Sequence, residues 1–524
     1  MPHATKVLPN FYRDSVSLMQ LSSALGKQPG VEQVSVIMAS PANLGLLREA
    51  GLLKEDLTAS PNDLLVAVQA RTTTALTAAM ARAEQLLREE PRAPSGQGAP
   101  AALKPRSIEM ALSQEPLTNL ALISTPGDYA AAEAMKALRL GLNVMLFSDN
   151  VSVADEVALK TLAQERGLLV MGPDCGTAII NGVPLAFANV VRRGEIGCVG
   201  ASGTGLQQVT CLVDRLGLGI SQAIGTGGHD MHVSVGGITM LAGIGALGRD
   251  PHTKVIVLIS KPPSPEVAKR VLEAASKVGK PVVVNFVGAD PKSITGRNLH
   301  PVKTLEDAAR TAVALAKGRK AATRRVLVKA PAFRLAAGQR YVRGLYSGGT
   351  FCYEASLLLG EALGGVRSNA PVNASDSIED PWRSRGHTVI DLGDDVFTRG
   401  RPHPMIDHRL RNERILKEAA DPEVAVILMD VVLGYGAHAD PAAEMAPVIQ
   451  AARARALKKK RRIAFVGFVC GTGADPQGLA AQEQALAKAG MMLASSNAEA
   501  AQLAAAIAGR ARAIPTRARK GAAP

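Results

Sequence analysis

The chain has 524 residues, of which 47% are hydrophobic, and 60 Lys and Arg against 46 Asp and Glu give a formal net charge of +14. This length exceeds what one hydrophobic core supports, and about 150 residues per domain predicts three or four domains. Nucleic-acid binding is not expected, because aromatic residues make up only 3% and the basic excess concentrates at 452–462 and 510–520 without a recognised nucleic-acid motif.

Cysteine usage and the N-terminal residues indicate the compartment. The five cysteines lack the CxxC or CxxH spacing of zinc sites, so no metal site and no disulfide framework is predicted. The N-terminus has no apolar signal core, and no uncharged apolar run approaches the roughly 20 residues that span a bilayer. We therefore expect a cytoplasmic protein without a membrane partner.

The first 108 residues divide into a small domain and a linker. Residues 1–90 contain apolar runs at Val31–Ala39 and Asp63–Ala70 and a helical pattern at Thr72–Glu90, which predict a small α+β domain. Residues 91–108 are rich in Pro, Gly and Ser and have no apolar periodicity, as is typical of a flexible linker.

The rest of the chain alternates short apolar runs with helical patterns, which favours α/β domains with parallel sheets and right-handed crossovers. We assign residues 109–190 to a Rossmann-like domain and residues 191–322 and 341–510 to two further doubly wound domains. Residues 323–340 are expected to be a linker, and residues 511–524 a basic tail.

The two later domains carry the same elements in the same order. Gly-Cys-Val-Gly-Ala-Ser-Gly-Thr (197–204) and Gly-Leu-Tyr-Ser-Gly-Gly-Thr (344–350) each lead into a helix. Each is followed by a strand with a glycine-rich end, at 227–230 and 393–395, and then by an Asp-Pro dipeptide before another strand. Such ordered recurrence indicates an internal duplication of one fold.

The two glycine-led turns are candidate anion sites. A helix N-terminus presents unpaired N–H groups with a partial charge of about +0.5, and glycine lets a ligand approach the backbone. The predicted anion-binding residues are Ser202, Gly203 and Thr204 in the first turn and Gly348, Gly349 and Thr350 in the second. The alternative is that these glycines only close tight βα turns.

Two histidines and two arginines are further candidates. His229 follows two glycines at a predicted strand end, where open α/β sheets bind ligands, and His403 lies in the arginine-rich segment 399–409. Either could be a catalytic acid or base, whereas Arg401 and Arg409 could hold a substrate carboxylate. The alternatives are a hydrogen-bonded loop histidine and an ordinary charged surface loop.

Several segments resemble the succinyl-CoA ligase superfamily. Met-Gly-Pro-Asp-Cys-Gly-Thr (171–177), Gly-Ala-Ser-Gly-Thr-Gly-Leu-Gln-Gln-Val (200–209) and Gly-Thr-Gly-Gly-His-Asp (225–230) resemble the ligase α subunit. Tyr-Ser-Gly-Gly-Thr-Phe-Cys-Tyr-Glu-Ala (346–355) resembles the C-terminal part of the β subunit. This resemblance implies a CoA-binding-type domain followed by two flavodoxin-like ligase domains.

Gly-Arg-Pro-His-Pro-Met-Ile-Asp-His-Arg (400–409) and Asp-Val-Val-Leu-Gly-Tyr-Gly-Ala-His-Ala-Asp-Pro (430–441) resemble the FdrA group specifically. The ligases carry a phosphohistidine in a Gly-His-Ala-Gly sequence, which residues 288–301 lack; only His300 stands nearby. A ligase glutamate corresponds to Lys261, and the glycine-rich CoA loop is missing. CoA or a nucleotide as cofactor is therefore implied by the resemblance alone.

FdrA-like proteins are labelled acyl-CoA synthetases by similarity, and the group is also associated with oxamate carbamoyltransferase in allantoin breakdown. Loss of the histidine and the CoA loop, with both anion sites kept, favours a carbamoyltransferase subunit that binds carbamoyl phosphate and oxamate and acts with companion subunits. The alternatives are an ADP-forming acyl-CoA ligase that uses a displaced histidine such as His300, and a non-catalytic subunit that senses a metabolite.

Overall fold

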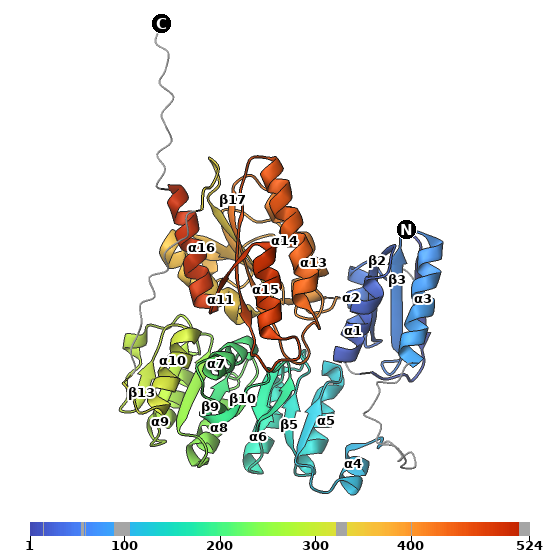
Figure 1. Cartoon of the computed structure of the whole chain (residues 1–524). Helices are drawn as coiled ribbons and strands as arrows, with labels where there is room; N and C mark the ends of the chain where they lie inside the picture. The colour runs from blue at the N-terminus through green and yellow to red at the C-terminus, as the bar shows by residue number, and fades with distance from the viewer. Residues whose placement is uncertain are drawn as a thin grey trace.

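The structure is a computed structural model that describes residues 1–13, 15–53, 57, 59–88, 105–320, 333–399 and 401–512. Its strands form four sheets. Figure 1 shows the N-terminal unit standing beside two larger α/β bodies that are stacked on each other, with a smaller α/β unit between the lower body and the N-terminal unit.

The N-terminal unit is an antiparallel sheet covered on both faces. Its elements are β1 (His3–Leu8), α1 (Ser15–Gly26), β2 (Val31–Met38), α2 (Pro41–Glu49), β3 (Leu64–Ala70) and α3 (Thr73–Arg88), with strand order β1-β3-β2. Side chains alternate along β2, so Val34 and Val36 pack against α1 and α3 while Ile37 packs with α2. The sequence analysis missed β1 and α1, because β1 is an edge strand that is only partly buried along its length.

The smaller α/β unit has a parallel sheet of three strands. Its elements are α4 (Ile108–Gln114), β4 (Leu120–Ile123), α5 (Gly127–Arg139), β5 (Asn143–Leu146), α6 (Val153–Glu165) and β6 (Val170–Met171). In the next hairpin, β7 (Thr177–Ile180) pairs with β8 (Val183–Ala186) and also with β10 (Ile220–Gly225) of the following sheet. The segment assigned to one domain at 109–190 thus contributes strands to two sheets.

The two larger bodies share one topology, which accords with the duplication inferred from the sequence. The first contains β9 (Arg193–Gly200), α7 (Gly203–Arg215), β10 (Ile220–Gly225), α8 (Ile238–Arg249), β11 (Val255–Ser260), α9 (Pro265–Ser276), β12 (Val282–Phe286), β13 (Leu299–Pro301) and α10 (Leu305–Ala316). The second contains β14 (Tyr341–Tyr346), α11 (Gly349–Leu363), β15 (Val366–Ser368), β16 (His387–Asp391), α12 (Asp395–Thr398), α13 (Arg409–Ala420), β17 (Val424–Val432), α14 (Pro441–Lys458), β18 (Ala464–Cys470), α15 (Leu479–Ala489), β19 (Met491–Ala494) and α16 (Asn497–Arg512).

The parallel strand order β10-β9-β11-β12-β13 in the first body corresponds to β16-β14-β17-β18-β19 in the second. This is the flavodoxin-like order, and the expected α/β class with parallel sheets is confirmed. All nine residues of β17 are buried, as expected for a strand covered on both faces.

The two bodies pack through the helices that follow the first and the last strand of each body. Side chains of α7, α10, α11 and α16 belong to one continuous apolar cluster that includes Leu206, Val209, Phe351 and Ala355. Because α7 and α11 each follow the first strand of their sheet, this packing brings their N-termini to the same place.

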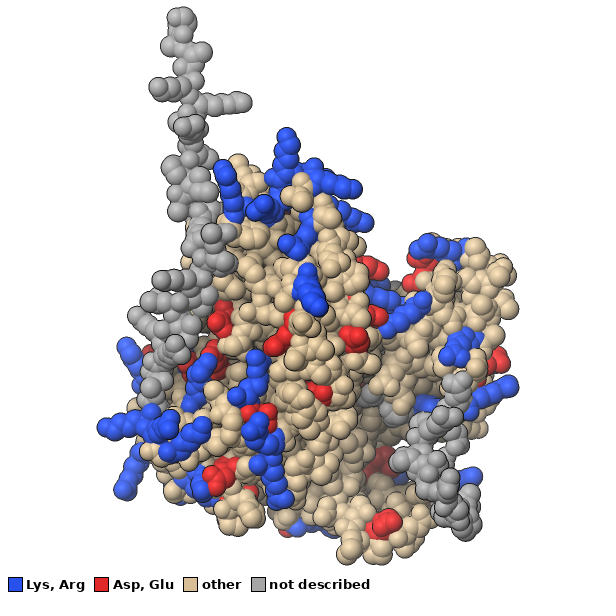
Figure 2. All heavy atoms as spheres, in the orientation of Figure 1, with Lys and Arg blue, Asp and Glu red and all other residues tan. Residues whose placement is uncertain are grey.

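The basic run at 452–462 lies at the C-terminal end of α14. Figure 2 shows Lys and Arg side chains gathered at the top of the molecule, over the end of that helix. Arg455 and Lys458 in the last turn complement the negative end of the helix dipole. Among the described residues, no helix combines the length and apolarity needed to cross a bilayer.

Candidate functional site

A cavity of about 680 Å³ lies where the N-terminal unit, the smaller α/β unit and both larger bodies meet. Its lining includes the segments that directly follow strands β4, β5, β6, β9, β10, β11 and β14. The carboxyl ends of parallel strands are the usual ligand-binding edge of open α/β sheets. The fold therefore places this cavity where the sequence analysis expected a site.

The N-termini of α7 and α11 meet in this cavity. Ser202 is the N-cap of α7, where its hydroxyl accepts the N–H of Gly205 at 2.9 Å. The same Oγ lies 2.6 Å from Oγ1 of Thr350 in the first turn of α11. A Cβ added at Gly348 would lie 2.9 Å from Thr204 Cγ2, so glycine permits this close approach. All six residues predicted to bind anions line the cavity.

Hydrogen bonds to a buried carboxylate fix the position of the N-terminus of α11. Asp430 accepts hydrogen bonds from the Ser347 N–H at 2.9 Å, the Ser347 hydroxyl at 2.8 Å and the Gly348 N–H at 2.9 Å. Burial raises the pKa of Asp430, and an ion pair with Arg411 at 2.9 Å opposes that rise. The backbone donors that α11 itself leaves without an acceptor are therefore those of Gly349, Thr350 and Phe351.

Lys261 brings a positive charge to the same region. It follows β11, lines the cavity, and its Nζ would be 3.8 Å from a Cβ built on Gly349. Burial raises the pKa of the neighbouring Asp391 to about 6, although the Lys261 ammonium acts to lower it. Where the ligases have a glutamate, this chain thus has a cation beside two helix N-termini.

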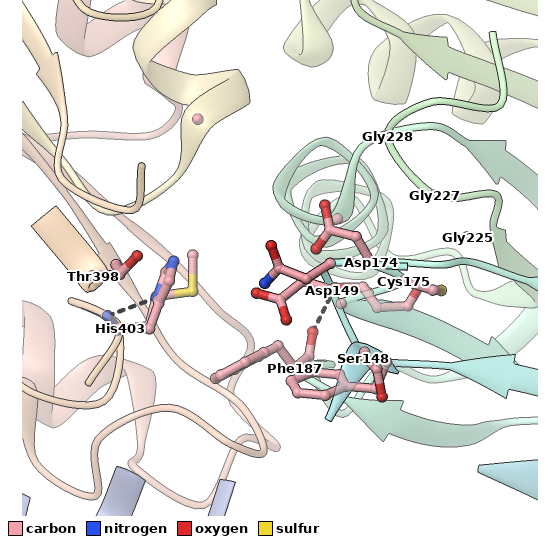
Figure 3. Close-up of a pocket in the computed structure, with 18 of the residues that line it drawn as sticks. Ser148, Asp149, Asp174, Cys175, Phe187, Gly225, Gly227, Gly228, Thr398 and His403 are labelled. Atoms are coloured by element: carbon pink, nitrogen blue, oxygen red, sulfur yellow. Dashed lines mark hydrogen bonds between the residues drawn. The ribbon is translucent and has the colours of Figure 1, made fainter. Parts of the chain in front are cut away.

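Two aspartates form the opposite wall. Figure 3 shows Asp149 and Asp174 on the side of the cavity that faces His403. Asp174 has φ +56°, and its N–H donates to Ser148 O at 3.0 Å, which fixes the two loops against each other. Burial by the cavity walls, reinforced by the charge of Asp149, raises the pKa of Asp174 to about 6, and burial also raises the pKa of Asp149.

The sequence analysis did not select these aspartates. Asp174 lies inside the Gly-Pro-Asp-Cys-Gly-Thr motif that it quoted for the resemblance, so that motif was an available signal. Asp149 follows the apolar run of β5 at another strand end, a weaker signal of the same kind.

His403 lines the cavity as a hydrogen-bond donor. The Met405 N–H donates to its Nδ1 at 3.2 Å, so the neutral ring carries its proton on Nε2. Burial, together with the charge of Arg411, lowers the pKa of His403 to about 4. At neutral pH this side chain therefore offers an uncharged N–H, and the ring of Phe187 lies 6.1 Å away as an apolar neighbour.

His229 also lines the cavity but is more exposed. Its side chain is 55% exposed, and its Nδ1 lies 3.6 Å from Glu156 Oε2. Glu156 belongs to a buried ionic cluster in which Lys160 Nζ bonds Glu156 at 2.7 Å and Asp230 at 2.8 Å. These contacts favour a place for His229 at the rim of the cavity, where the Glu156 carboxylate holds it, over a place facing the helix N-termini.

The structure places the two arginines that were predicted to bind a carboxylate at different sites. Arg401 lines the cavity, with its guanidinium 5.9 Å from the ring centroid of Trp382. Arg409 is not a cavity residue: it is paired with Asp407 at 2.6 Å, and a Cβ on Gly26 would overlap its guanidinium. Arg409 therefore belongs to the contact with the N-terminal unit, because the carboxylate two residues earlier holds it there.

His300, the displaced histidine of the ligase alternative, lies on β13 and does not line the cavity. Burial lowers its pKa. Among the described residues, no group of three or more His, Cys, Asp or Glu side chains is arranged to hold a metal ion.

Three family models match segments of the chain. They are a CoA-ligase domain at residues 345–507, a CoA-binding domain at 191–288, and the heavy metal-associated domain of AllF at 1–103. The CoA-binding match falls on the first larger body, later than the segment 109–190 to which the sequence analysis gave a CoA-binding-type domain. Residues 1–103 contain no cysteine, the usual ligand of soft metal ions.

The uncharacterized protein YahF of Escherichia coli K12 is 44% identical over 482 residues, which cover 91% of this chain and 93% of YahF. The α subunit of the ADP-forming succinate–CoA ligase of Aquifex aeolicus is 29% identical over 176 residues, or 32% of this chain and 56% of that subunit. The dinucleotide-forming acetyl-coenzyme A synthetase 1 of Ca. Korarchaeum cryptofilum aligns over 75% of this chain and 83% of its own, with a TM-score of 0.32 and 16% identity. The chain thus belongs to the family of Escherichia coli YahF, within the succinyl-CoA ligase and acyl-CoA synthetase superfamily.

Proposed function

We propose that the chain is an FdrA-type carbamoyltransferase subunit that binds carbamoyl phosphate between the N-termini of α7 and α11. The observation that carries this proposal is the meeting of the two helix N-termini, joined by Ser202 and Thr350, beside the Lys261 ammonium in one cavity. Donors and charges fixed before binding stabilise a doubly negative phosphate better than mobile ones.

Two other side chains of the cavity are suited to the carbamoyl group and to the carboxylate of the acceptor. The Nε2–H of His403 is available to donate to the carbamoyl oxygen, which makes the carbonyl carbon more electrophilic. Arg401 is the cationic group for the carboxylate of a small acceptor such as oxamate. In this scheme binding and charge stabilisation supply the catalysis, and no protein side chain forms a covalent bond.

Asp174 is the base of the proposed reaction. As the acceptor nitrogen bonds to the carbonyl carbon, the C–O bond to phosphate breaks, and phosphate leaves with the electron pair. The nitrogen's proton passes to the Asp174 carboxylate, whose pKa of about 6 lies close to neutral pH, where a base is most effective. Asp149 supports this role because its charge helps to raise that pKa.

The match of residues 1–103 to a domain of AllF supports a role in allantoin breakdown. We propose that the chain acts there with companion subunits. The absence of a histidine equivalent to the ligase phosphohistidine also favours direct transfer, because His300 lies outside the cavity.

The proposal is tested by thermal shift with carbamoyl phosphate, oxamate, phosphate, CoA and ATP. A ligand at one hundred times its dissociation constant stabilises the native state by about 2.7 kcal/mol. Carbamoyl phosphate and phosphate should shift the wild type but not Gly349→Val, since a Cβ there would lie 2.5 Å from Asp391 Oδ2. Gly360→Val on the same helix is the matched control, because no heavy atom lies within 4 Å of its added Cβ.

An ADP-forming acyl-CoA ligase is the second candidate, favoured by the CoA-binding and CoA-ligase matches. The first βα turn of the smaller unit is Ser-Thr-Pro-Gly-Asp (124–128), which does not provide the glycine-rich loop expected for CoA. A shift with CoA, or acid-labile phosphate on the protein after incubation with succinyl-CoA and phosphate, would support this ligase. A shift with carbamoyl phosphate and activity confined to a partner would indicate a metabolite-sensing subunit instead.

A further inference from the structure

The N-terminal unit forms one wall of the cavity. Its lining residues come from α1, from β2 and from Ser40 and the first turn of α2: Leu18, Met19, Ser22, Ser35, Val36, Ile37, Met38, Ser40 and Asn43. These residues belong to the part of the chain that matches the AllF domain, far in sequence from both helix N-termini. The site is therefore incomplete without residues 3–88.

This wall presents no charged side chain to the cavity among the described residues. The Ser22 hydroxyl accepts the Val36 N–H at 2.9 Å and donates to Leu18 O at 2.9 Å, and Asn43 Nδ2 donates to Met38 O at 2.9 Å. The Ser22 hydroxyl and the Asn43 amide are thus used within the unit, and none of the described lining residues of the unit is a Lys, Arg, Asp or Glu. Such a surface excludes water and does not bind the charged parts of a substrate.

Polar contacts attach the unit to both sides of the cavity. At the end of α1, Lys27 Nζ lies 2.8 Å from Glu444 Oε1 and 2.9 Å from His438 Nε2 of the second body. On the other side, the Tyr12 hydroxyl donates to Ser124 O of the smaller unit at 3.3 Å. The unit thus contacts the second body on one side of the cavity and the smaller unit on the other.

The Lys27–Glu444 contact is weak enough to open. The two side chains are 41% and 22% exposed, and ion pairs in this range contribute little to stability. The pair therefore contributes little to holding the unit against the second body, whose Arg409 guanidinium also packs at Gly26.

We propose that the N-terminal unit is a closing wall that shields bound carbamoyl phosphate from water, with the Lys27–Glu444 pair as its latch. The shielding rests on the proposed function, whereas the closing movement does not. Carbamoyl phosphate is a reactive mixed anhydride. Attack by a water oxygen on its carbonyl carbon would break the C–O bond to phosphate and release carbamate, phosphate and a proton. Excluding water prevents this loss and strengthens the electrostatic contacts of the site.

The test uses Lys27→Glu and Glu444→Lys in the full chain. Hydrogen–deuterium exchange without substrate follows the backbone N–H groups at 200–210 and 345–352. Each single variant should increase exchange there by about fivefold, the upper range for losing a half-exposed ion pair, and the double charge swap should restore protection. Lys6→Glu is the matched control, because Lys6 pairs with Glu84 inside the unit and its side chain is also 41% exposed.

The same variants are then assayed with carbamoyl phosphate. The ratio of phosphate released by hydrolysis to carbamoyl product formed should rise about fivefold in each single variant and return in the double variant. Unchanged exchange in both single variants would overturn the closing wall. Increased exchange with an unchanged ratio would overturn its shielding role. Increased exchange without consumption of carbamoyl phosphate by any variant would support the closing wall and count against the proposed transferase.

Discussion

The pH dependence of the proposed transfer follows from Asp174. Burial and the charge of Asp149 raise the pKa of this carboxyl from its usual 3.8 to about 6. At pH 5 only about a tenth of the carboxyl is ionised, against about nine tenths for an ordinary aspartate. Because the base acts when ionised, kcat should fall about tenfold per pH unit below 6 and level off above 7.

Asp174→Asn removes the base and should lower kcat by about 10²- to 10⁴-fold at pH 7.5, while phosphate binding stays close to wild type. Asp149→Asn should keep the activity and move the acidic limb to lower pH, because it removes a charge that raises the Asp174 pKa. The assay is a pH–rate profile of carbamoyl phosphate consumption with the companion subunits present. Asp376→Asn, at a partly exposed aspartate outside the cavity, is the control.

A wild-type rate for Asp174→Asn would refute its role as base. An acidic limb that stays near pH 6 in both Asp174→Asn and Asp149→Asn would assign the titration to another group. Asp391 would be the first candidate, because burial raises its pKa to about 6 as well. The raised pKa of Asp174 has the opposite effect on folding stability: activity increases as pH rises through about 6, whereas stability decreases. A carboxyl with a raised folded-state pKa stabilises the fold below its unfolded pKa, and that contribution is lost as pH rises through about 6. Asp174→Asn should therefore reduce the loss of thermal stability between pH 4 and pH 7.

Three further predictions concern the other groups of the cavity. Gly348→Ala adds a methyl group at the contact between α7 and α11 and should destabilise the fold by about 1–3 kcal/mol in urea unfolding, whereas Gly360→Ala on the same helix should not destabilise it. His403→Phe should lower kcat by about 10²- to 10³-fold at every pH above 5, because a neutral donor with pKa about 4 does not titrate there; a pH-dependent defect would contradict the donor role. Arg401→Ala should raise the KM for the carboxylate acceptor about tenfold, and Arg409→Ala should leave that KM unchanged; the reverse result in steady-state kinetics would restore Arg409 as the binding residue.

The local patterns of the chain predict most of its architecture. Continuous apolar runs such as residues 424–429 predict buried parallel strands, and the two glycine-led turns predict where each duplicated fold begins. The N-terminal unit was predicted less completely, because an edge strand such as β1 buries little and carries a weak apolar signal. The sequence analysis also did not predict which sheet contains the β7–β8 hairpin. The hairpin pairs with β10, which lies more than 30 residues further along the chain, and local patterns do not report such pairing.

The site depends on contacts between residues that lie far apart in the sequence, and the local pattern of one segment does not predict such contacts. Sequence spacing could not separate Arg401 from Arg409, because whether a guanidinium faces the cavity depends on the carboxylate and the helix packed beside it. Asp149 and Asp174 lie on different strand ends, and only the parallel order β5-β6 places them on one wall.

By itself, the sequence determined the α/β class, the duplication and the two helix N-termini suited to an anion, because these features depend on local periodicity and on glycine. The tertiary structure alone decided that both N-termini share one cavity, that Lys261, His403 and two aspartates face it, and that residues 18–43 close it. Those relations arise from the packing of α7 against α11 and from the docking of the N-terminal unit, which depend on long-range burial and not on local residue patterns.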